Sequence, residues 1–229
     1  MIEKTLKTTT GKLLIKLPDQ LSEITLGQMI ELQEKEDMSD IDAISILSGM
    51  AIAELANVKD ANDLLIFGDA VLSLSQQIAR LYNSDAVPKE ISFTSGKVKV
   101  MNNLSIEPAG AFMAAREIIA DEIKQCIKVY GEENWQNYFN PSLKSCCQLL
   151  AHYFYCRATG NPYNDHEAEA FTTEIKKLRV TEALPVAKHF FTCYPNLSKP
   201  KTSFFHRLQR PWKKRQVSKL LKSSNTSIQ

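Results

Sequence analysis

The sequence predicts a mainly α-helical protein with short β-strands, in which two diverged strand-to-helix repeats pack as one helical body ahead of a basic tail. Three observations carry this prediction. Apolar residues recur at helical spacing behind recognisable caps along most of the chain. Two short segments have the turn boundaries of strands. Glu182 is the last acidic residue, and every charged side chain after it is basic.

Charge divides the chain into parts of opposite character. Residues 183–229 hold ten of the 28 basic side chains and none of the 26 acidic ones, so residues 1–182 carry a net charge of −8 and the remainder carries +10. We expect a polar N-terminal arm at 1–10, a helical body at 11–192 and a basic C-terminal tail at 193–229. The apolar content of 44% is ordinary for a protein that buries a core.

The body is expected to open with a strand and two helices. The segment GKLLIKL at 11–17 begins at a turn glycine, is apolar enough for a short strand and ends at a proline. Thr25 is placed to cap the first helix. Ser39 with Asp42 resembles a capping box, which predicts a second helix at 41–57.

A third helix, a hairpin and a long helix follow. The third helix is predicted at about 61–82, and Gly68 inside it indicates close packing or a break, because Gly costs about 1 kcal/mol relative to Ala in a helix. Residues 91–100 (ISFTSGKVKV) alternate on both sides of a Ser-Gly pair, which predicts a hairpin. The long helix enters near Pro108 and runs to about Tyr130.

Three further helices complete the predicted body. Asn140 and the proline after it mark the start of a helix at 143–157 that is apolar and aromatic enough to be central. Two more helices are predicted at about 165–178 and 181–192. Pro185 is expected in the first turn of the last one, where its missing N–H is not needed.

The strand-to-helix passage occurs twice with matched landmarks. These are Gly11-Lys12, Leu21-Ser22 and Gly27 in the first copy, and Gly96-Lys97, Leu104-Ser105 and Gly110 in the second. The Leu-Ser pair and the following glycine have the same spacing in both copies. A duplicated unit normally buries its apolar face against its sibling. We therefore expect repeat units at about 11–84 and 91–192 to pack together as one body.

The cysteines and the N-terminus indicate a reducing compartment. The five cysteines are odd in number and lack C-x-x-C spacing, which favours reduced thiols packed among apolar neighbours. No run of eighteen apolar residues occurs, and residues 1–10 lack the apolar stretch of a signal peptide. We expect a cytoplasmic protein without a transmembrane segment.

The most enzyme-like cluster surrounds His166. Acidic residues flank it, but Ala170 stands where the second histidine of an H-E-x-x-H metal site would fall. The preferred interpretation is that Asp165 caps a helix, while Glu167 and Glu169 complement the positive end of its dipole. A metal-dependent hydrolase at this cluster is the weakest of the functions that we consider.

No other candidate points to catalysis. His152 lies in an apolar and aromatic run without a nearby nucleophile or carboxylate partner, which favours a core or interface histidine over a general base. The sequence contains no G-x-x-x-x-G-K-[ST], G-x-G-x-x-G or G-x-S-x-G motif. We therefore predict that the protein is not an enzyme and has no catalytic, cofactor-binding or metal-binding residues.

Aromatic residues concentrate in the second half of the chain, and most of them are expected in the core. The exception is a set of tail residues in which aromatic and basic side chains alternate. This candidate partner-binding set consists of Phe204, Phe205, Arg207, Arg210, Trp212, Lys213, Lys214 and Arg215. Such a segment suits a partner groove, an anionic lipid surface or nucleic acid. The alternative is a solvated helix, or one that docks on the acidic body of the same chain.

Three phrases together resemble a known class of protein. They are LPDQLSEITLGQMIELQ near the start, YFYCRATGNPYNDHEAE at the end of the aromatic helix, and LRVTEALPVAKHFF after it. This layout resembles the tail assembly chaperones encoded among the tail genes of tailed bacteriophages. The resemblance implies a non-catalytic protein of the host cytoplasm or the virion that escorts other protein subunits during assembly. The alternative function is a nucleic-acid-binding or DNA-packaging accessory protein that uses the basic tail on phosphates.

Overall fold

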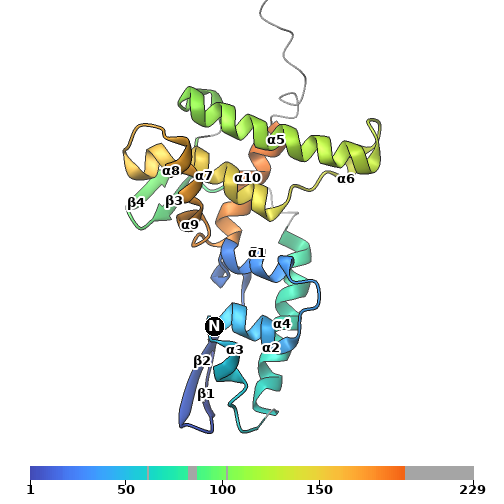
Figure 1. Ribbon diagram of the computed structural model, residues 1–229, viewed down its shortest axis with the longest axis vertical. Coiled ribbons are helices and arrows are strands. Elements are labelled where there is room, and N and C mark those ends of the chain that lie inside the picture. The colour runs from blue at the N-terminus through green and yellow to red at the C-terminus, as the bar shows by residue number, and fades with distance from the viewer. Residues whose placement is uncertain (61, 82–86, 102, 194–229) are drawn as a thin grey trace, which may run out of the picture.

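The computed structural model describes residues 1–60, 62–81, 87–101 and 103–193 (Figure 1). Helices predominate, with two small antiparallel two-stranded sheets, which confirms the predicted mainly α fold with minor β. In chain order the elements are β1 (Ile2–Lys7), β2 (Lys12–Leu17), the 3₁₀ turn η1 (Leu21–Glu23), α1 (Leu26–Glu34), α2 (Asp40–Ser48), α3 (Ile52–Leu55), α4 (Asn62–Leu81), β3 (Glu90–Phe93), β4 (Gly96–Lys99), the 3₁₀ turn η2 (Leu104–Ile106), α5 (Ala109–Tyr130), α6 (Trp135–Tyr138), α7 (Leu143–Thr159), α8 (Asp165–Ala170), α9 (Thr172–Ile175) and α10 (Val180–Cys193).

The elements form two groups that meet at α1 (Figure 1). The first group contains the β1–β2 hairpin with α2, α3 and α4, and the second contains everything from β3 to α10. Helix α5 lies across the far end of the second group, and α7 packs beneath it. Helix α7 buries eleven residues and is the central helix that its apolar sequence predicts.

The N-terminal residues form a strand, so the predicted polar arm at 1–10 is wrong. Strand β1 pairs with β2 in an antiparallel register that sets Ile2 opposite Leu17 and Lys7 opposite Lys12. Leu6 is buried in the core, whereas its polar neighbours on the strand face outward. Only two apolar residues mark this strand, and its partner β2 supplies the backbone hydrogen bonds that stabilise it.

The caps predicted at Thr25 and Ser39 are confirmed, but the second helix is shorter than expected. Thr25 caps α1 and forms a capping box with Gln28, while Ser39 does the same for α2 with Asp42. The helix predicted at 41–57 is wrong as one piece, because Gly49 takes a left-handed conformation (φ +72°) and ends α2. Glycine adopts this conformation without the steric cost of a Cβ atom.

The sequence suggested that Gly68 permits close packing or breaks its helix, and neither explanation is correct. Helix α4 continues through it without a break. A Cβ atom added at this position would meet only a carboxylate oxygen of Asp40, at 3.9 Å. The glycine therefore marks neither close packing nor a helix end.

Three local details of the second group differ from the sequence prediction. Ser142 caps α7 in place of Asn140, and its hydroxyl accepts from the Ser145 N–H. The helix predicted at 165–178 is instead the two short helices α8 and α9. Pro185 is the sixth residue of α10 and so lies beyond the first turn that was expected for it, since that helix begins at Val180.

The two copies of the repeat form matching structures. In each copy the second strand of a hairpin leads to a 3₁₀ turn at the Leu-Ser pair and then to a helix. The matched glycines, Gly27 and Gly110, are the second residues of α1 and α5. Both lie at close contacts: an added Cβ would lie 3.1 Å from the Lys176 carbonyl oxygen at the first and 2.5 Å from the Tyr163 ring at the second. Each glycine permits a neighbouring segment to approach a helix start.

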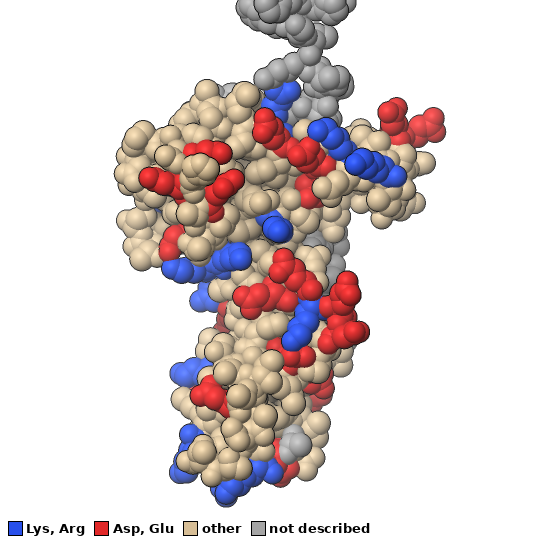
Figure 2. All heavy atoms as spheres, in the orientation of Figure 1, with Lys and Arg blue, Asp and Glu red and all other residues tan. Residues whose placement is uncertain are grey.

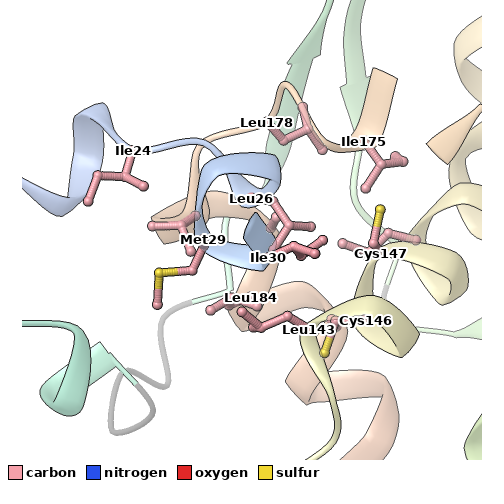
Figure 3. Close-up of a cluster of buried hydrophobic side chains, with 14 of the residues drawn as sticks. Ile24, Leu26, Met29, Ile30, Leu143, Cys146, Cys147, Ile175, Leu178 and Leu184 are labelled. Carbon is pink, nitrogen blue, oxygen red and sulfur yellow. The ribbon is translucent and has the colours of Figure 1, made fainter. Parts of the chain in front are cut away.

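The start of α1 binds the connection between α9 and α10. The N–H groups of Leu26 and Gly27 donate to the carbonyls of Leu178 and Lys176, both at 2.8 Å, and the Val180 N–H donates to the Ile24 carbonyl at 2.9 Å. These bonds use N–H groups that a helix start leaves without intrahelical acceptors. The surrounding side chains form one buried cluster that joins α1 to the second group, shown in Figure 3 as Ile24, Leu26, Met29, Ile30, Leu143, Cys146, Cys147, Ile175, Leu178 and Leu184.

Candidate protein-contact site

The tail set predicted from the sequence lies outside the described residues. This applies to all eight members: Phe204, Phe205, Arg207, Arg210, Trp212, Lys213, Lys214 and Arg215. The candidate site is therefore built from the described surface next to the end of α10, the helix that leads into the tail.

An apolar groove of about 400 Å³ lies between α10 and the chain that connects α6 with α7. Its apolar lining comes from Tyr138, Phe139 and Pro141 on one side and from Leu184 and Phe191 on the other. Lys188 and Thr192, from the last turns of α10, add polar groups. Predominantly apolar hollows with a few polar groups are the usual form of binding sites.

The groove is shaped by a turn and by contacts between rings. Gly131 ends α5 at a positive φ of +79°, which turns the chain into α6. The Trp135 ring packs edge-on against Phe139 with centroids 5.6 Å apart, and Phe139 contacts Phe191 of α10 at 6.0 Å. Phe139 thereby joins the two walls of the groove.

Two exposed tyrosines extend the groove along the end of α5. Tyr130 and Tyr138 stack with ring centroids 4.6 Å apart and an interplanar angle of 12°. Tyr138 is 59% exposed and Val129 is 73% exposed, so this end of the molecule presents apolar surface to solvent. Tyrosine supplies contact area with little loss of side-chain entropy and is enriched where proteins bind one another. We name Val129, Tyr130, Tyr138 and the groove together the aromatic face.

The histidine candidates lie elsewhere. His166 is exposed on α8, and Asn164, not Asp165, caps that helix by accepting from the Glu167 N–H at 3.2 Å. No group of three or more His, Cys, Asp or Glu residues that could hold a metal ion occurs in the described part of the chain. His152 is buried, as expected, and its Nδ1 lies 2.9 Å from the Tyr163 hydroxyl. Burial is the main cause that lowers the pKa of His152.

The two adjacent cysteines of α7 are packed side chains. Cys146 and Cys147 are buried and have free thiols. Burial raises the pKa of Cys147 to about 11 and shifts that of Cys146 further in the same direction. A raised pKa keeps the thiol protonated at neutral pH, which lowers its reactivity.

Sequence reasoning missed the aromatic face. It placed Tyr138 and Phe139 among the aromatic residues expected mostly in the core, yet Tyr138 is largely exposed. A signal was present, because WQNYF follows a helix-ending glycine and precedes Asn140-Pro141, so it had to belong to a short connection. The sequence does not indicate which rings face outward.

The chain was compared with protein families, curated proteins and solved structures. No family model, curated protein or solved structure matches the chain. Within the described ranges, no helix has both the length and the apolar character needed to cross a bilayer.

Proposed function

We propose that this protein is a non-catalytic assembly or adaptor protein, similar to the tail assembly chaperones of tailed bacteriophages, that acts through protein–protein contacts. The observation that carries the proposal is the aromatic face, in which stacked exposed tyrosines continue into an apolar groove. The sequence phrases that resemble tail assembly chaperones supply the biological context. In this proposal the protein acts in the host cytoplasm or stays in the virion.

The physical argument concerns what such a surface gains by binding. The exposed apolar area of Val129 and the two tyrosines is removed from water when a partner covers it, at about 25 cal/mol per Å². Contacts of this type concentrate binding energy in a few aromatic residues around which water is excluded. Lys188 and Thr192 at the groove edge offer polar contacts that fix the orientation of the partner.

The proposal is tested by co-expression with the products of the flanking genes, followed by size-exclusion chromatography and titration of any complex. We expect one of these products, a structural component of a phage tail, to form a stoichiometric complex. Tyr138→Ala should weaken that complex by about tenfold or more, as expected for a central aromatic contact. Leu65→Ala, at an exposed apolar position on α4, is the matched control and should leave the affinity unchanged.

A second candidate function follows from the ten basic residues after Glu182. A nucleic-acid-binding protein would bind a DNA fragment with an affinity that falls steeply with salt, because counterions are released from the phosphates. Tight, salt-dependent DNA binding that is unaffected by Tyr138→Ala, together with no complex with any flanking gene product, would replace the assembly function with this one.

A further inference from the structure

The apolar groove lies beside the point at which the basic tail joins the body. Phe191 and Thr192 line the groove, and Cys193, the last residue of α10, follows them directly. Leu184 is the groove residue of α10 farthest from Cys193 and precedes it by nine residues. Nine residues of helix span about 14 Å. The whole α10 wall of the groove is therefore within a short distance of the start of the tail.

The lining of the groove suits an aromatic occupant. Its walls contain the rings of Tyr138, Phe139 and Phe191, and its volume is about 400 Å³. Hollows of this size bind ligands through mostly apolar contacts. Aromatic side chains bury a large area and pack favourably against other rings at tilted or edge-on angles. A segment that inserts phenyl rings would therefore gain most from this site.

The chain itself carries such a segment. Phe204 and Phe205 are the only adjacent aromatic residues after Cys193 in the sequence. Phe204 follows Cys193 by eleven residues, and an extended chain of that length spans about 36 Å. This reach is more than twice the length of the α10 wall, so the connecting residues can return the two rings to the groove.

Charge favours the same placement. Glu132 and Glu133 are exposed in the turn between α5 and α6, and the two stacked tyrosines flank this turn. Figure 2 shows acidic side chains at this corner of the molecule. The first charged residues after the two phenylalanines are Arg207 and Arg210, which are attracted to these carboxylates. Lys188 at the groove edge opposes the attraction with a single charge.

We propose that Phe204 and Phe205 occupy the groove of their own chain. This inference rests on the proposed function, since it concerns the same aromatic face, and it assigns the groove to the tail of the protein. Val129 and the tyrosine stack then remain for the assembly partner, and the basic residues that follow Phe205 lie next to them. The partner meets aromatic rings and cations as one surface.

The connection within one chain favours its own tail over a second copy. A segment tethered by a short linker has an effective concentration in the millimolar range at its site. A second copy of the chain at micromolar concentration supplies its tail at about a thousandth of that level. The groove is therefore filled within each molecule.

The probe is a fluorescein-labelled peptide with the sequence of residues 199–212, titrated with full-length chains and followed by fluorescence anisotropy. Phe204→Ala with Phe205→Ala in the full-length chain empties the groove. We expect this variant to bind the peptide about tenfold more tightly than the native chain, whose own tail competes at millimolar effective concentration. The matched control is Leu220→Ala with Leu221→Ala, which removes two apolar side chains from the same tail and should leave the affinity within twofold of the native value.

A further substitution locates the bound peptide. Tyr138→Ala, added to the Phe204/Phe205 variant, should weaken peptide binding by about fivefold or more, because this ring lines the groove. Leu65→Ala in the same background changes an exposed residue of α4 and should have no effect. Sedimentation velocity tests the alternative occupant. The native chain and the Phe204/Phe205 variant should have the same mass at every concentration between 1 and 100 μM.

Three results would overturn the proposal. The first is equal affinity of the peptide for the native chain and the Phe204/Phe205 variant. The second is tighter binding to that variant that Tyr138→Ala does not weaken, which would place the tail elsewhere. The third is a native dimer that the Phe204/Phe205 variant does not form, which would assign the groove to the tail of a second copy. The measurements use no assembly partner, so their failure leaves the proposed function standing.

Discussion

At the scale of single residues, two helical glycines have opposite surroundings. A Cβ atom at Gly110 would lie 2.5 Å from two carbons of the Tyr163 ring, and that ring is held by hydrogen bonds to His152 and Asp165. At Gly68 the nearest atom is 3.9 Å away. The same substitution therefore tests packing at one site and helix propensity at the other.

We expect Gly110→Ala to lower the free energy of unfolding by about 1–3 kcal/mol, because the ring must shift from its position. Gly68→Ala, the matched control, should raise it by up to about 1 kcal/mol, since Ala favours the helix and reduces the entropy of the unfolded chain. Urea denaturation measures both. Equal effects at the two positions would show that Tyr163 does not constrain Gly110.

His152 should make stability depend on pH. Burial lowers its pKa from the ordinary value of 6.5, while the nearby Asp165 and Glu169 oppose this shift more weakly. The unfolded chain then binds the proton at a higher pH than the folded one, so stability is full above pH 6.5 and falls as the pH decreases below it. Glu117 and Asp121 line the same surface hollow as the His152 ring. The Tyr163 hydroxyl forms a hydrogen bond with Nδ1 of that ring.

The pH dependence is measured as the melting temperature between pH 7.5 and about pH 5, a range above the ordinary pKa values of carboxylates. His152→Gln should flatten the decrease, because it removes the group that titrates. His166→Gln changes an exposed histidine of α8 and should retain the native profile. If the His152 variant kept the native dependence of melting temperature on pH, other titrating groups would be responsible for that dependence.

At the scale of elements, Gln28 connects two helices. Its side chain completes the capping box of α1 by accepting from the Thr25 N–H at 3.0 Å. Its amide nitrogen also donates to the carbonyls of Ile46 and Leu47 at the end of α2, at 3.2 and 2.9 Å. One side chain therefore satisfies polar groups at a helix start and at a helix end.

We expect Gln28→Ala to destabilise the protein by about 1–3 kcal/mol, because it leaves partly buried backbone groups without partners. Gln33→Ala is the matched control, since it makes the same change at an exposed position of the same helix. Chemical denaturation compares the two. A loss in the control as large as that in Gln28→Ala would mean that the connection to α2 contributes little.

At the scale of the whole molecule, α1 joins the group that contains α2–α4 to the group that contains β3–α10. We therefore expect the two groups to unfold together. Leu26 is fully buried there, and its N–H donates to the Leu178 carbonyl. Leu26→Ala should cost about 2–5 kcal/mol and lower hydrogen-exchange protection in α4 and α7 alike. Leu65→Ala, exposed on α4, should change neither helix. Native protection of α7 in the Leu26 variant, or proteolysis into stable fragments near 84–90, would show that the groups are independent.

The basic tail should be dispensable for stability. The buried cluster of the described chain ends at Phe191, so deletion of 199–229 removes none of its members. We expect this deletion to leave the melting temperature within a few degrees of the native value and to weaken partner binding. A deletion that starts at 179 removes the buried residues of α10 and should unfold the protein. Unfolding of the shorter deletion would place the tail in the core.

The sequence by itself determined the features that depend on neighbouring residues. The caps at Thr25 and Ser39, the stop at Gly131 and the hairpin of β3 and β4 were all predicted, because a cap or a tight turn is satisfied by side chains a few positions away. The repeat was also visible, since its landmarks keep their spacing.

Only the tertiary structure decided the features that join distant residues. Strand β1 is stabilised by pairing with β2, and two backbone bonds from the start of α1 reach Lys176 and Leu178. A hollow of about 480 Å³ combines Glu117 of α5, His152 of α7 and Glu169 of α8, and the groove combines α6 with α10. Local spacing carries no information about such contacts, because the packing of the whole chain sets which helix faces meet.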